Sequence, residues 1–240
     1  MNCSDYKRAR RPEQKKERML EITDTVDAMF HEDTYHEITL TTIAERMGMS
    51  RGNLYKYFDT VEDIFMSLYL QKQCKCMTDI MNLFFECDTD GEEICPENDF
   101  ERYECKHLVY NRMSMEDFAG RVAHVFVENA DIFKYHDLLG CIIETNVPVE
   151  KLAEFKKNMA CMKSPLTLAI KKQCPNASDK RITLFLKSIM YQGCGLYNQS
   201  HQCPKVAKAI RLAGLTTEEI DFEAELKRFI LSEMNQIENV

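Results

Sequence analysis

The segment "TLTTIAERMGMSRGNLYKYF", residues 39–58, holds two helix starts and one helix stop. Thr39 is of a residue type that caps helix N-termini, and Gly48 is suited to ending the helix that Thr39 begins. Ser50 provides a second cap directly after that glycine. The segment therefore predicts two short helices joined by a sharp turn.

The packing positions of this segment fit two helices that cross closely. Such a pair needs a small residue at the crossing, a residue that tolerates positive φ in the turn and an apolar anchor on the second helix. Ala44, Gly48 and Leu54 occupy the positions where these demands fall. The pattern predicts a helix-turn-helix, in which the second helix lies in the major groove of DNA. The alternative is a plain three-helix core in which Tyr and Phe are packing residues.

Candidate DNA contacts follow from this reading. The first residues of the second helix face base edges, where Arg suits guanine and Asn suits adenine. These candidates are Ser50, Arg51, Gly52 and Asn53. Side chains further along suit phosphate contacts, which set register more than sequence. These are Tyr55, Lys56 and Tyr57, and the set is completed by Thr41 and Thr42 on the preceding helix.

Positive charge is concentrated at the N-terminus. The chain carries a formal net charge of −8, but residues 1–20 hold seven Lys or Arg against three acids, which leaves +4 there and −12 elsewhere. Such a distribution indicates a local electrostatic footprint on an acidic body. Lys7 and Arg8 are therefore further candidate DNA contacts. A solvated basic tail is the alternative.

The remainder of the chain has almost entirely helical periodicity. We expect a first helix with Pro12 in its first turn and a fourth helix from the Thr60–Asp63 capping box to about Cys87. Ser114 begins a further helix, and others are expected over 131–145, 149–173, 179–198 and 216–236. No convincing strand alternation or internal repeat is visible. The predicted fold class is all-α.

Composition restricts the class of protein. The 240 residues contain no apolar run near membrane-helix length and no apolar N-terminal signal, so we expect a cytoplasmic protein without membrane association. The odd number of cysteines, eleven, favours reduced thiols. No zinc-type cysteine pair, nucleophile elbow, phosphate loop or dinucleotide fingerprint is present. We expect no catalytic residue, no metal and no cofactor.

The stretch "ITLTTIAERMGMSRGNLYKYFDTVEDIF", Ile38–Phe65, resembles the DNA-binding signature of the TetR (tetracycline-repressor-like) transcriptional regulators. The matching positions are Thr39, Ile43, Ala44, Gly48, Ser50, Leu54, Tyr55, Phe58 and Glu62. Two positions depart from the signature: Met47 replaces the usual Ala, and Val61 stands where a phosphate-contacting Lys is common. The resemblance is specific over residues 13–70 and general in length and helicity beyond.

The resemblance implies a helix-turn-helix domain, 1–60, and a larger helical ligand-binding and dimerisation domain, 61–240. It implies a repressor that binds operator DNA as a homodimer, through the helices 179–198 and 216–236, and that a small molecule releases. Gly193 and Gly195 add an independent reason, since they leave a flat face for another helix, unless they end the helix. The fourth helix would transmit ligand binding, since a small tilt separates the two recognition helices.

Candidate ligand contacts are Met and aromatic side chains, which suit adaptable apolar pockets. They are Phe118, Phe126, Phe133, Tyr135, Met159 and Met162, with Glu144 as a polar handle for a ligand amine. Core packing, or surface exposure for the glutamate, is the alternative. A second candidate function is a DNA-binding thiol or metal sensor. Its candidate residues are Cys74, Cys76, Cys105, His107 and Cys141.

Overall fold

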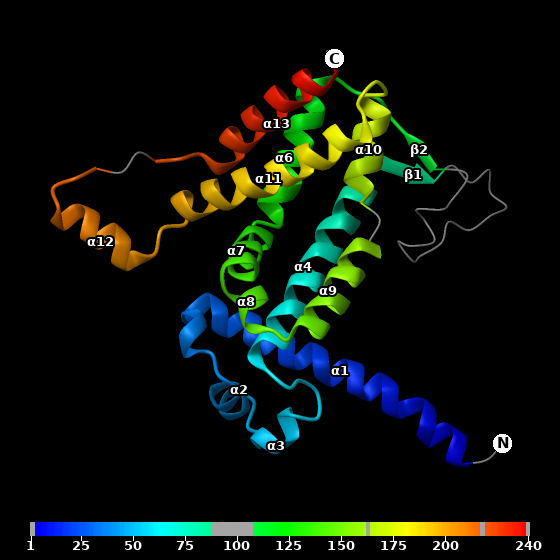
Figure 1. Cartoon of the computed structure of the whole chain (residues 1–240), viewed down its shortest axis with the longest axis vertical. Helices are drawn as coiled ribbons and strands as arrows, with labels where there is room; N and C mark the ends of the chain where they lie inside the picture. Colours follow the sequence, from blue (N-terminus) through cyan, green and yellow to red (C-terminus); the bar gives the residue numbers. More distant parts are fainter. Residues whose placement is uncertain (1–2, 88–107, 162–163, 217–218, 239–240) are drawn as a thin grey trace. The chain divides into compact units, whose positions relative to one another are not determined.

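The computed structural model of the chain describes residues 3–87, 108–161, 164–216 and 219–238 (Figure 1). The side chains of residues 3–12, 87 and 161 lie outside that description. Contacts divide the chain into an N-terminal unit, Met1–Gln71 with Leu138–Phe155, and a C-terminal unit, Lys72–Asp137 with Lys156–Val240. The functional division into 1–60 and 61–240 stays a prediction, because the two units are defined by contacts within the chain and not by function.

The N-terminal unit is helical. Its elements are α1 (Cys3–Glu32), the 3-10 helix η1 (Tyr35–Glu37), α2 (Leu40–Arg46), α3 (Arg51–Leu54), the first part of α4 (Val61–Phe84), the π-helix η2 (Leu139–Ile143), α8 (Glu144–Asn146) and the first part of α9 (Val149–Cys161). Helices α1 to α4 supply most of its core. Its most deeply buried residues include Ile22, Val26, Ile43, Leu54 and Phe65, each at most 1% exposed.

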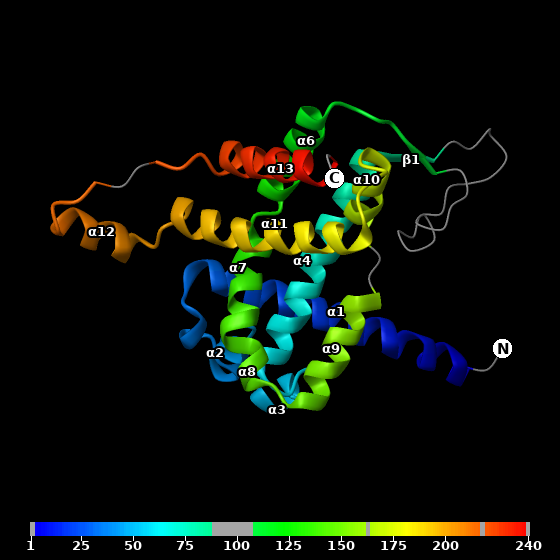
Figure 2. The ribbon, with the colours of Figure 1, turned by 45° about the horizontal axis from the view of Figure 1, so that its top comes forward.

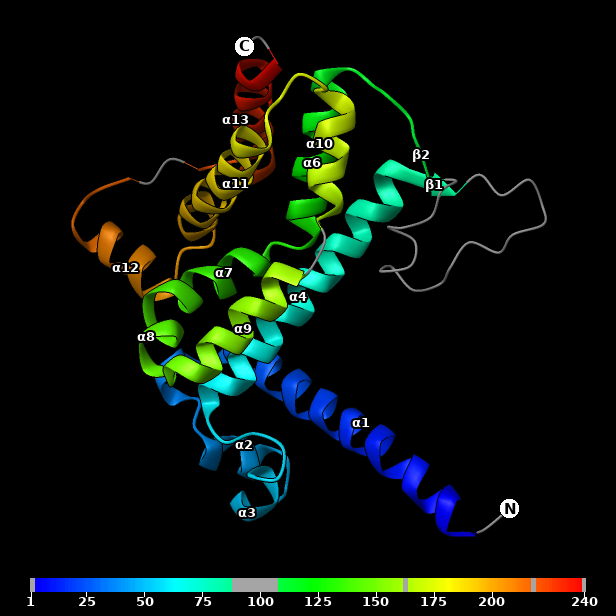
Figure 3. The ribbon, with the colours of Figure 1, turned by 45° about the vertical axis from the view of Figure 1, so that its right-hand side comes forward.

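The C-terminal unit contains the longer helices of the second half of the chain. It holds the remainder of α4 and α9, the strands β1 (Phe85–Cys87) and β2 (Leu108–Tyr110), and the helices α6 (Met115–Glu128), α7 (Asp131–Leu138), α10 (Pro165–Gln173), α11 (Asp179–Ser200), α12 (Pro204–Leu212) and α13 (Phe222–Glu238). Figures 1, 2 and 3 show α11 and α13 side by side. Helix α13 packs against both α6 and α11.

Local capping signals of the sequence are confirmed. The Thr39 hydroxyl accepts a hydrogen bond from the Thr42 amide at 3.1 Å and begins α2. The Thr60 hydroxyl accepts from the Asp63 amide, and the Asp63 carboxylate accepts from the Thr60 amide, both at 3.1 Å. Ser114 caps α6 with the same type of bond. These caps satisfy amides that have no partner inside the helix.

Several predicted helix bounds are wrong. Helix α1 begins at Cys3, before Pro12, within a stretch rich in good helix formers. The helix predicted over 131–145 is interrupted by η2, which contains the weak helix former Gly140. The run 149–173 forms two helices, because Ser164 caps α10 and Pro165 fits its first turn.

The end of the chain also departs from the prediction. The last helix begins at Phe222 instead of near Thr216, since the Asp221 carboxylate accepts a hydrogen bond from the Ala224 amide at 3.0 Å. Helix α12, whose residues are all at least partly exposed, was not predicted. The antiparallel ladder of β1 and β2 was missed as well; it pairs Phe85 with Tyr110. Apart from this ladder, the all-α prediction is confirmed for the described residues.

The core of the C-terminal unit includes one close approach between α7 and α11. The Phe133 ring is fully buried and lies against Gly193, where an added Cβ would be 2.0 Å from the ring atom Cε1. The Phe126 and Phe222 rings flank Phe133, with centroids 5.4 and 5.7 Å away. Gly193 therefore admits an aromatic ring of its own chain, and neither it nor Gly195 ends α11.

A buried amide joins α4 to the turn between α6 and α7 in the C-terminal unit. Asn129 is 8% exposed, and its Nδ2 donates to Asp79 Oδ2 at 2.8 Å and to the Val125 carbonyl at 2.9 Å. Lys75 Nζ donates to Asp79 at 2.9 Å and to Asn129 Oδ1 at 2.7 Å. The network satisfies both ends of a buried amide, which would otherwise destabilise the fold.

This network predicts a loss of stability in acid. Burial by itself raises the pKa of Asp79, but hydrogen bonds from Asn129 and Lys75 outweigh it and lower the pKa below the ordinary 3.8. A carboxyl with a depressed folded-state pKa stabilises the fold above pH 4 or so and loses this contribution as pH falls through that pKa. The side chain is 38% exposed, so we expect less than about 1 kcal/mol.

Urea unfolding of the wild type and Asp79→Asn between about pH 7 and about pH 3 measures this contribution. The variant should be less stable near neutral pH, and the difference should shrink in acid. A stability difference that stayed constant with pH would show that the carboxylate charge is irrelevant.

Candidate DNA-binding site

The helix-turn-helix prediction describes the local structure of residues 39–58. Gly48 has φ +62°, a left-handed conformation that glycine adopts without the steric cost of a side chain. Ile43, Ala44 and Leu54 are 0%, 2% and 0% exposed, so the predicted packing residues are buried. Figure 3 shows α2 and α3 as two short helices joined by a tight turn.

The conformation of Gly48 predicts a cost for a side chain at this position. An added Cβ at Gly48 has no atom within 4 Å, so the cost of Gly48→Ala comes from its φ alone. We expect a loss of about 1 kcal/mol in the free energy of unfolding, measured by urea titration followed by circular dichroism.

Gly52→Ala is the matched control, since Gly52 has equally open surroundings but no positive φ. It should be neutral or stabilising by up to about 1 kcal/mol. Equal losses for the two variants would contradict the assigned role of the turn.

Helix α3 presents its first residues to solvent. Ser50 caps it by accepting a hydrogen bond from the Asn53 amide at 3.3 Å. Arg51 and Gly52 are exposed, and Asn53 is half-buried. Leu54 is fully buried and anchors the helix to the core. All four candidate base-reading residues thus lie in or next to one short, anchored helix.

The third helix is shorter than predicted. It ends at Leu54 instead of near Phe58, and the Tyr57 amide donates to the Leu54 carbonyl at 2.9 Å in a turn. Tyr55 and Lys56 are exposed and Tyr57 is half-buried. These three candidates therefore follow the helix as a turn, which still leaves two of them accessible to phosphates.

Tyr55 orients the Arg51 side chain. Arg51 Nη2 donates to the Tyr55 hydroxyl at 3.2 Å, and the guanidinium carbon lies 6.0 Å from the centre of the Tyr55 ring. A guanidinium held in this way loses less side-chain freedom when it binds. Arg51 is thus partly pre-positioned at the start of α3.

The two threonines of α2 differ. Thr41 is exposed. The Thr42 hydroxyl accepts from the Thr39 amide at 2.9 Å and lies 3.0 Å from the Thr39 carbonyl oxygen, so it helps to cap α2. The side chains of Lys7 and Arg8 lie outside the described residues, although their backbone belongs to α1.

A lysine from a distant part of the chain anchors the segment after α3. Lys151 Nζ donates to Asp59 Oδ2 at 2.9 Å and to Asp63 Oδ2 at 2.8 Å. The hydrogen bonds to Asp63 and Asp59 raise the pKa of Lys151. This link belongs to the N-terminal unit and was not predicted, because Lys151 is separated from Asp59 by 92 positions.

The candidate ligand residues fall in both units of the structure. Phe118, Phe126 and Tyr135 are at most 3% exposed and belong to the core of the C-terminal unit. Met159 is half-buried in α9, whereas Glu144 lies in the N-terminal unit. Met162 lies outside the described residues. The centroids of the Phe118 and Phe84 rings are 4.8 Å apart, which is a core contact.

The described cysteine candidates also fall in both units. Burial, followed by the negative charge of Asp79, raises the pKa of Cys76 to about 12, which opposes the thiolate that metals and oxidants require. Cys74 and Cys141 are exposed, in different units. Cys105 and His107 lie outside the described residues.

Family comparisons match both parts of the chain. Residues 22–68 match the family model described as bacterial regulatory proteins, tetR family. Residues 98–232, more than half of the chain, match the tetracyclin repressor-like C-terminal domain. The chain belongs to the TetR family. Members of this family regulate transcription by binding DNA and are not enzymes.

Individual relatives of this TetR-family chain are distant. The fatty acid metabolism regulator protein of Bacillus subtilis (strain 168) is 34% identical over 59 residues, which is 25% of this chain and 30% of that protein. A TetR family transcription regulator from Marinobacter aquaeolei VT8 is 12% identical, with a TM-score of 0.47 over 93% of this chain and 97% of the other. A candidate transcription regulator from Lactobacillus plantarum gives 15% identity, a TM-score of 0.40, and 90% and 97% coverage.

The chain thus spans under a third of the curated relative that it matches. No helix within the described ranges combines the length and the apolar character needed to cross a membrane.

Proposed function

We propose that this TetR-family regulator binds operator DNA sequence-specifically as a homodimer and represses transcription until a small molecule releases it. The observation that carries the proposal is α3 itself. Its N-terminal end exposes Arg51 beside the half-buried Asn53, while its far end is fixed by the fully buried Leu54. An anchored helix with base-reading side chains at its start matches the geometry of major-groove recognition.

Phosphate contacts surround this reading helix in the proposal. Tyr55, Lys56 and Thr41 are exposed, so their polar groups are accessible to the DNA backbone. Lys7 and Arg8 remain proposed contacts of the N-terminal arm. Such contacts set register and strengthen binding to every sequence, whereas Arg51 and Asn53 supply the discrimination. A DNA-binding role also makes the cytoplasm the predicted location.

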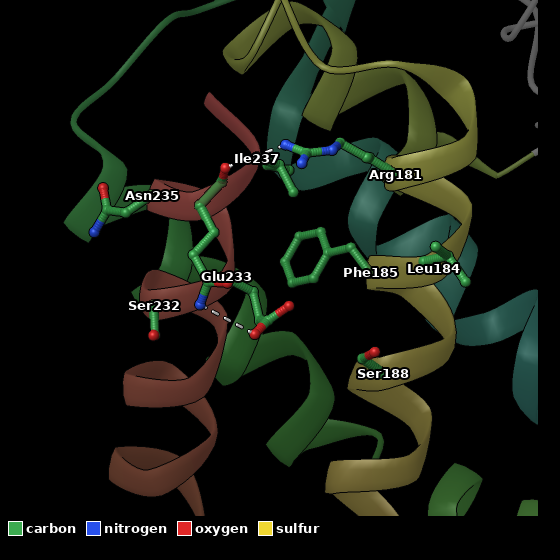
Figure 4. A pocket seen from close by; sticks show the side chains of 9 residues that line it. Arg181, Leu184, Phe185, Ser188, Ser232, Glu233, Asn235 and Ile237 are labelled. Atoms are coloured by element: carbon green, nitrogen blue, oxygen red, sulfur yellow. Dashed lines mark hydrogen bonds between the residues drawn. The ribbon is translucent and has the colours of Figure 1, made fainter. Parts of the chain in front are cut away.

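Exposed side chains on α11 favour the proposed homodimer. Leu184 and Tyr191 are 53% and 67% exposed, and Ser188 and the open Gly195 continue the same helical stripe. A cleft of about 710 Å³ between α11 and α13 adjoins this stripe. Figure 4 shows Phe185 directed from α11 toward α13. Arg181 Nη1 donates to the Gln236 carbonyl at 3.4 Å. A second copy that packed here would cover the exposed apolar groups.

The proposed dimer predicts a variant that separates the subunits. Tyr191→Glu places a charge on the exposed stripe, so it should shift full-length protein toward monomer in sedimentation equilibrium by at least about tenfold in dissociation constant. Thr183→Glu is the control, because Thr183 is exposed on α11 but outside that stripe. A wild-type chain that sediments as a monomer would contradict the homodimer.

Release by a small molecule would involve the aromatic candidates of the C-terminal unit. The aromatic candidates Phe118, Phe126 and Tyr135 are buried, so a ligand among them would have to separate packed side chains. Helix α4 contributes residues to both units, which makes it the element through which such a change would reach α3. A ligand lowers operator affinity only if it prefers the state in which the two α3 helices are mis-spaced.

Fluorescence-anisotropy titration tests DNA binding directly. The full-length protein is titrated against duplex DNA from upstream of its own gene and against a scrambled duplex, at several salt concentrations. We expect preferential, salt-sensitive binding to the first duplex, with the preference reduced in Asn53→Ala. Equal affinity for both duplexes, unaffected by Asn53→Ala, would contradict sequence recognition by α3.

A further inference from the structure

The segment that joins α3 to α4 is held by a side chain from α9. Lys151 Nζ donates to Asp59 Oδ2 at 2.9 Å and to Asp63 Oδ2 at 2.8 Å. Asp59 follows directly after the buried Phe58, and Asp63 lies in the first turn of α4. One ammonium group therefore ties the end of this segment to the start of α4.

The packing of α9 fixes the place from which the Lys151 side chain extends. Lys151 lies in the first turn of α9, and Phe155 follows one helical turn later, so both side chains lie on one face of the helix. Phe155 is 4% exposed, and its ring centroid lies 6.3 Å from that of the buried Tyr69 of α4. These residues all belong to the N-terminal unit. The ammonium group is thus carried by a helix that is anchored on α4.

Asp63 connects the ion pair to the backbone of the same segment. Its Oδ2 atom also accepts a hydrogen bond from the Thr60 amide at 3.1 Å. The side chain of Asp63 is 14% exposed, whereas that of Asp59 is 74% exposed. Because water screens the bond to Asp63 less, we expect this bond to be the stronger of the two.

The charge of Lys151 is balanced inside this cluster. Two carboxylates accept from its single ammonium group, so the cluster has an excess of negative charge. Contacts to DNA phosphates favour an excess of positive charge. The arrangement therefore favours a role of Lys151 inside the protein over a direct contact with DNA.

We propose that Lys151 is a positioning residue for DNA recognition, which acts through Asp63 and Asp59 to hold α3 in the orientation that recognises base edges. The proposal rests on the proposed function, because it requires that α3 recognises DNA sequence. Leu54 anchors α3 to the core, and the Lys151 bridge adds a second constraint beyond the turn that follows α3. A helix held by one constraint alone can rotate, which misplaces contacts to base edges more than contacts to phosphates.

Two variants with opposite changes in charge separate positioning from a simple effect of charge. Lys151→Met removes a positive charge and Asp63→Asn removes a negative charge, and each breaks the ion pair. Asparagine keeps an oxygen that can accept from the Thr60 amide, so the start of α4 stays capped. If charge alone mattered, the first variant would weaken DNA binding and the second would strengthen it. If Lys151 positions α3, both variants lower the preference for the operator.

Anisotropy titrations of the full-length protein measure this preference as the ratio of its affinities for the upstream and scrambled duplexes described above. We expect Lys151→Met and Asp63→Asn each to reduce the ratio by about tenfold, with a much smaller change in affinity for the scrambled duplex. The double variant should lose no more than either single variant, because the two residues act through one bond. Lys151→Arg should keep the wild-type ratio, since it keeps the charge and the donors.

Lys157→Met is the matched control, because Lys157 is an exposed lysine of the same helix and its loss changes the net charge by the same amount. It should keep the wild-type ratio. A partly exposed ion pair adds little to global stability, so all variants should fold, which circular dichroism checks.

Three results would overturn the proposal and leave the proposed function intact. They are a wild-type ratio in Lys151→Met, a higher ratio in Asp63→Asn, and an equal loss in Lys151→Met and Lys157→Met. A wild-type protein with no preference between the two duplexes would overturn both.

Discussion

Gly193→Ala is expected to lower the free energy of unfolding by about 3 kcal/mol, the upper part of the range for overpacked cores. The added Cβ would lie 2.0 Å from Cε1 and 2.5 Å from Cζ of Phe133, far inside contact distance. The ring has little room to move, because Phe133 is fully buried and packs against Phe126 and Phe222. The variant must therefore displace either an aromatic cluster or α11.

Gly195→Ala provides the control on the same helix. Gly195 has no atom within 4 Å of an added Cβ, so alanine there should add up to about 1 kcal/mol of helix stability. Urea unfolding of both variants, followed by circular dichroism, gives the comparison. Two variants of equal stability would mean that the approach of Phe133 to α11 does not hold in solution.

Arg51→Ala is expected to weaken binding to the operator by about 10- to 100-fold, while binding to scrambled DNA falls much less. The reason is the position of Arg51 at the exposed start of α3, where the bond to Tyr55 orients its guanidinium. An Arg that reads a base edge contributes to discrimination, whereas a phosphate contact contributes equally to all sequences. Anisotropy titrations against both duplexes measure the two affinities.

Lys56→Ala is the companion variant. Lys56 is exposed and follows α3 in the turn, so its loss should weaken both duplexes by a similar factor and reduce the salt slope by about 1. The two variants thus separate recognition of bases from contacts to phosphates. A similar loss of affinity for both duplexes in Arg51→Ala would assign Arg51 to the DNA backbone instead of the base edges.

The helix-turn-helix segment, residues 39–58, could be predicted because its structure is determined locally. Thr39 and Ser50 cap helices within three residues of themselves, and the positive φ of Gly48 is a property of that glycine. Leu54 and Ala44 are buried, and α2 and α3 pack against each other. Residue type and spacing alone therefore carried this part of the fold.

The contacts that escaped prediction join distant residues. The bonds from Lys151 to Asp59 and Asp63 and the approach of Phe133 to Gly193 depend on which elements pack together. The exposed helix α12 was missed for a different reason. This helix is short, begins with Pro204 and has no buried residue. Its sequence therefore shows no long series of core positions, which is the main signal of a stable helix.

The candidate site shows the same distinction. Arg51 and Asn53 could be named from their place in a motif, but the link from Lys151 to the segment after α3 could not, because Lys151 is separated from Asp59 by 92 positions. The aromatic candidates for ligand binding were chosen by residue type, which does not distinguish a pocket wall from a core. Phe118, Phe126 and Tyr135 are buried in this structure, and their part in ligand binding stays a prediction.

The most direct test of the central claim, that this chain reads DNA sequence through α3, is a selection of bound duplexes from a random library by the full-length protein, followed by sequencing. We predict enrichment of one motif with two related half-sites about 10 base pairs apart, or a multiple of that spacing, and loss of the enrichment in Arg51→Ala with Asn53→Ala. A bound pool that stayed random, or one enriched equally by the double variant, would contradict the claim.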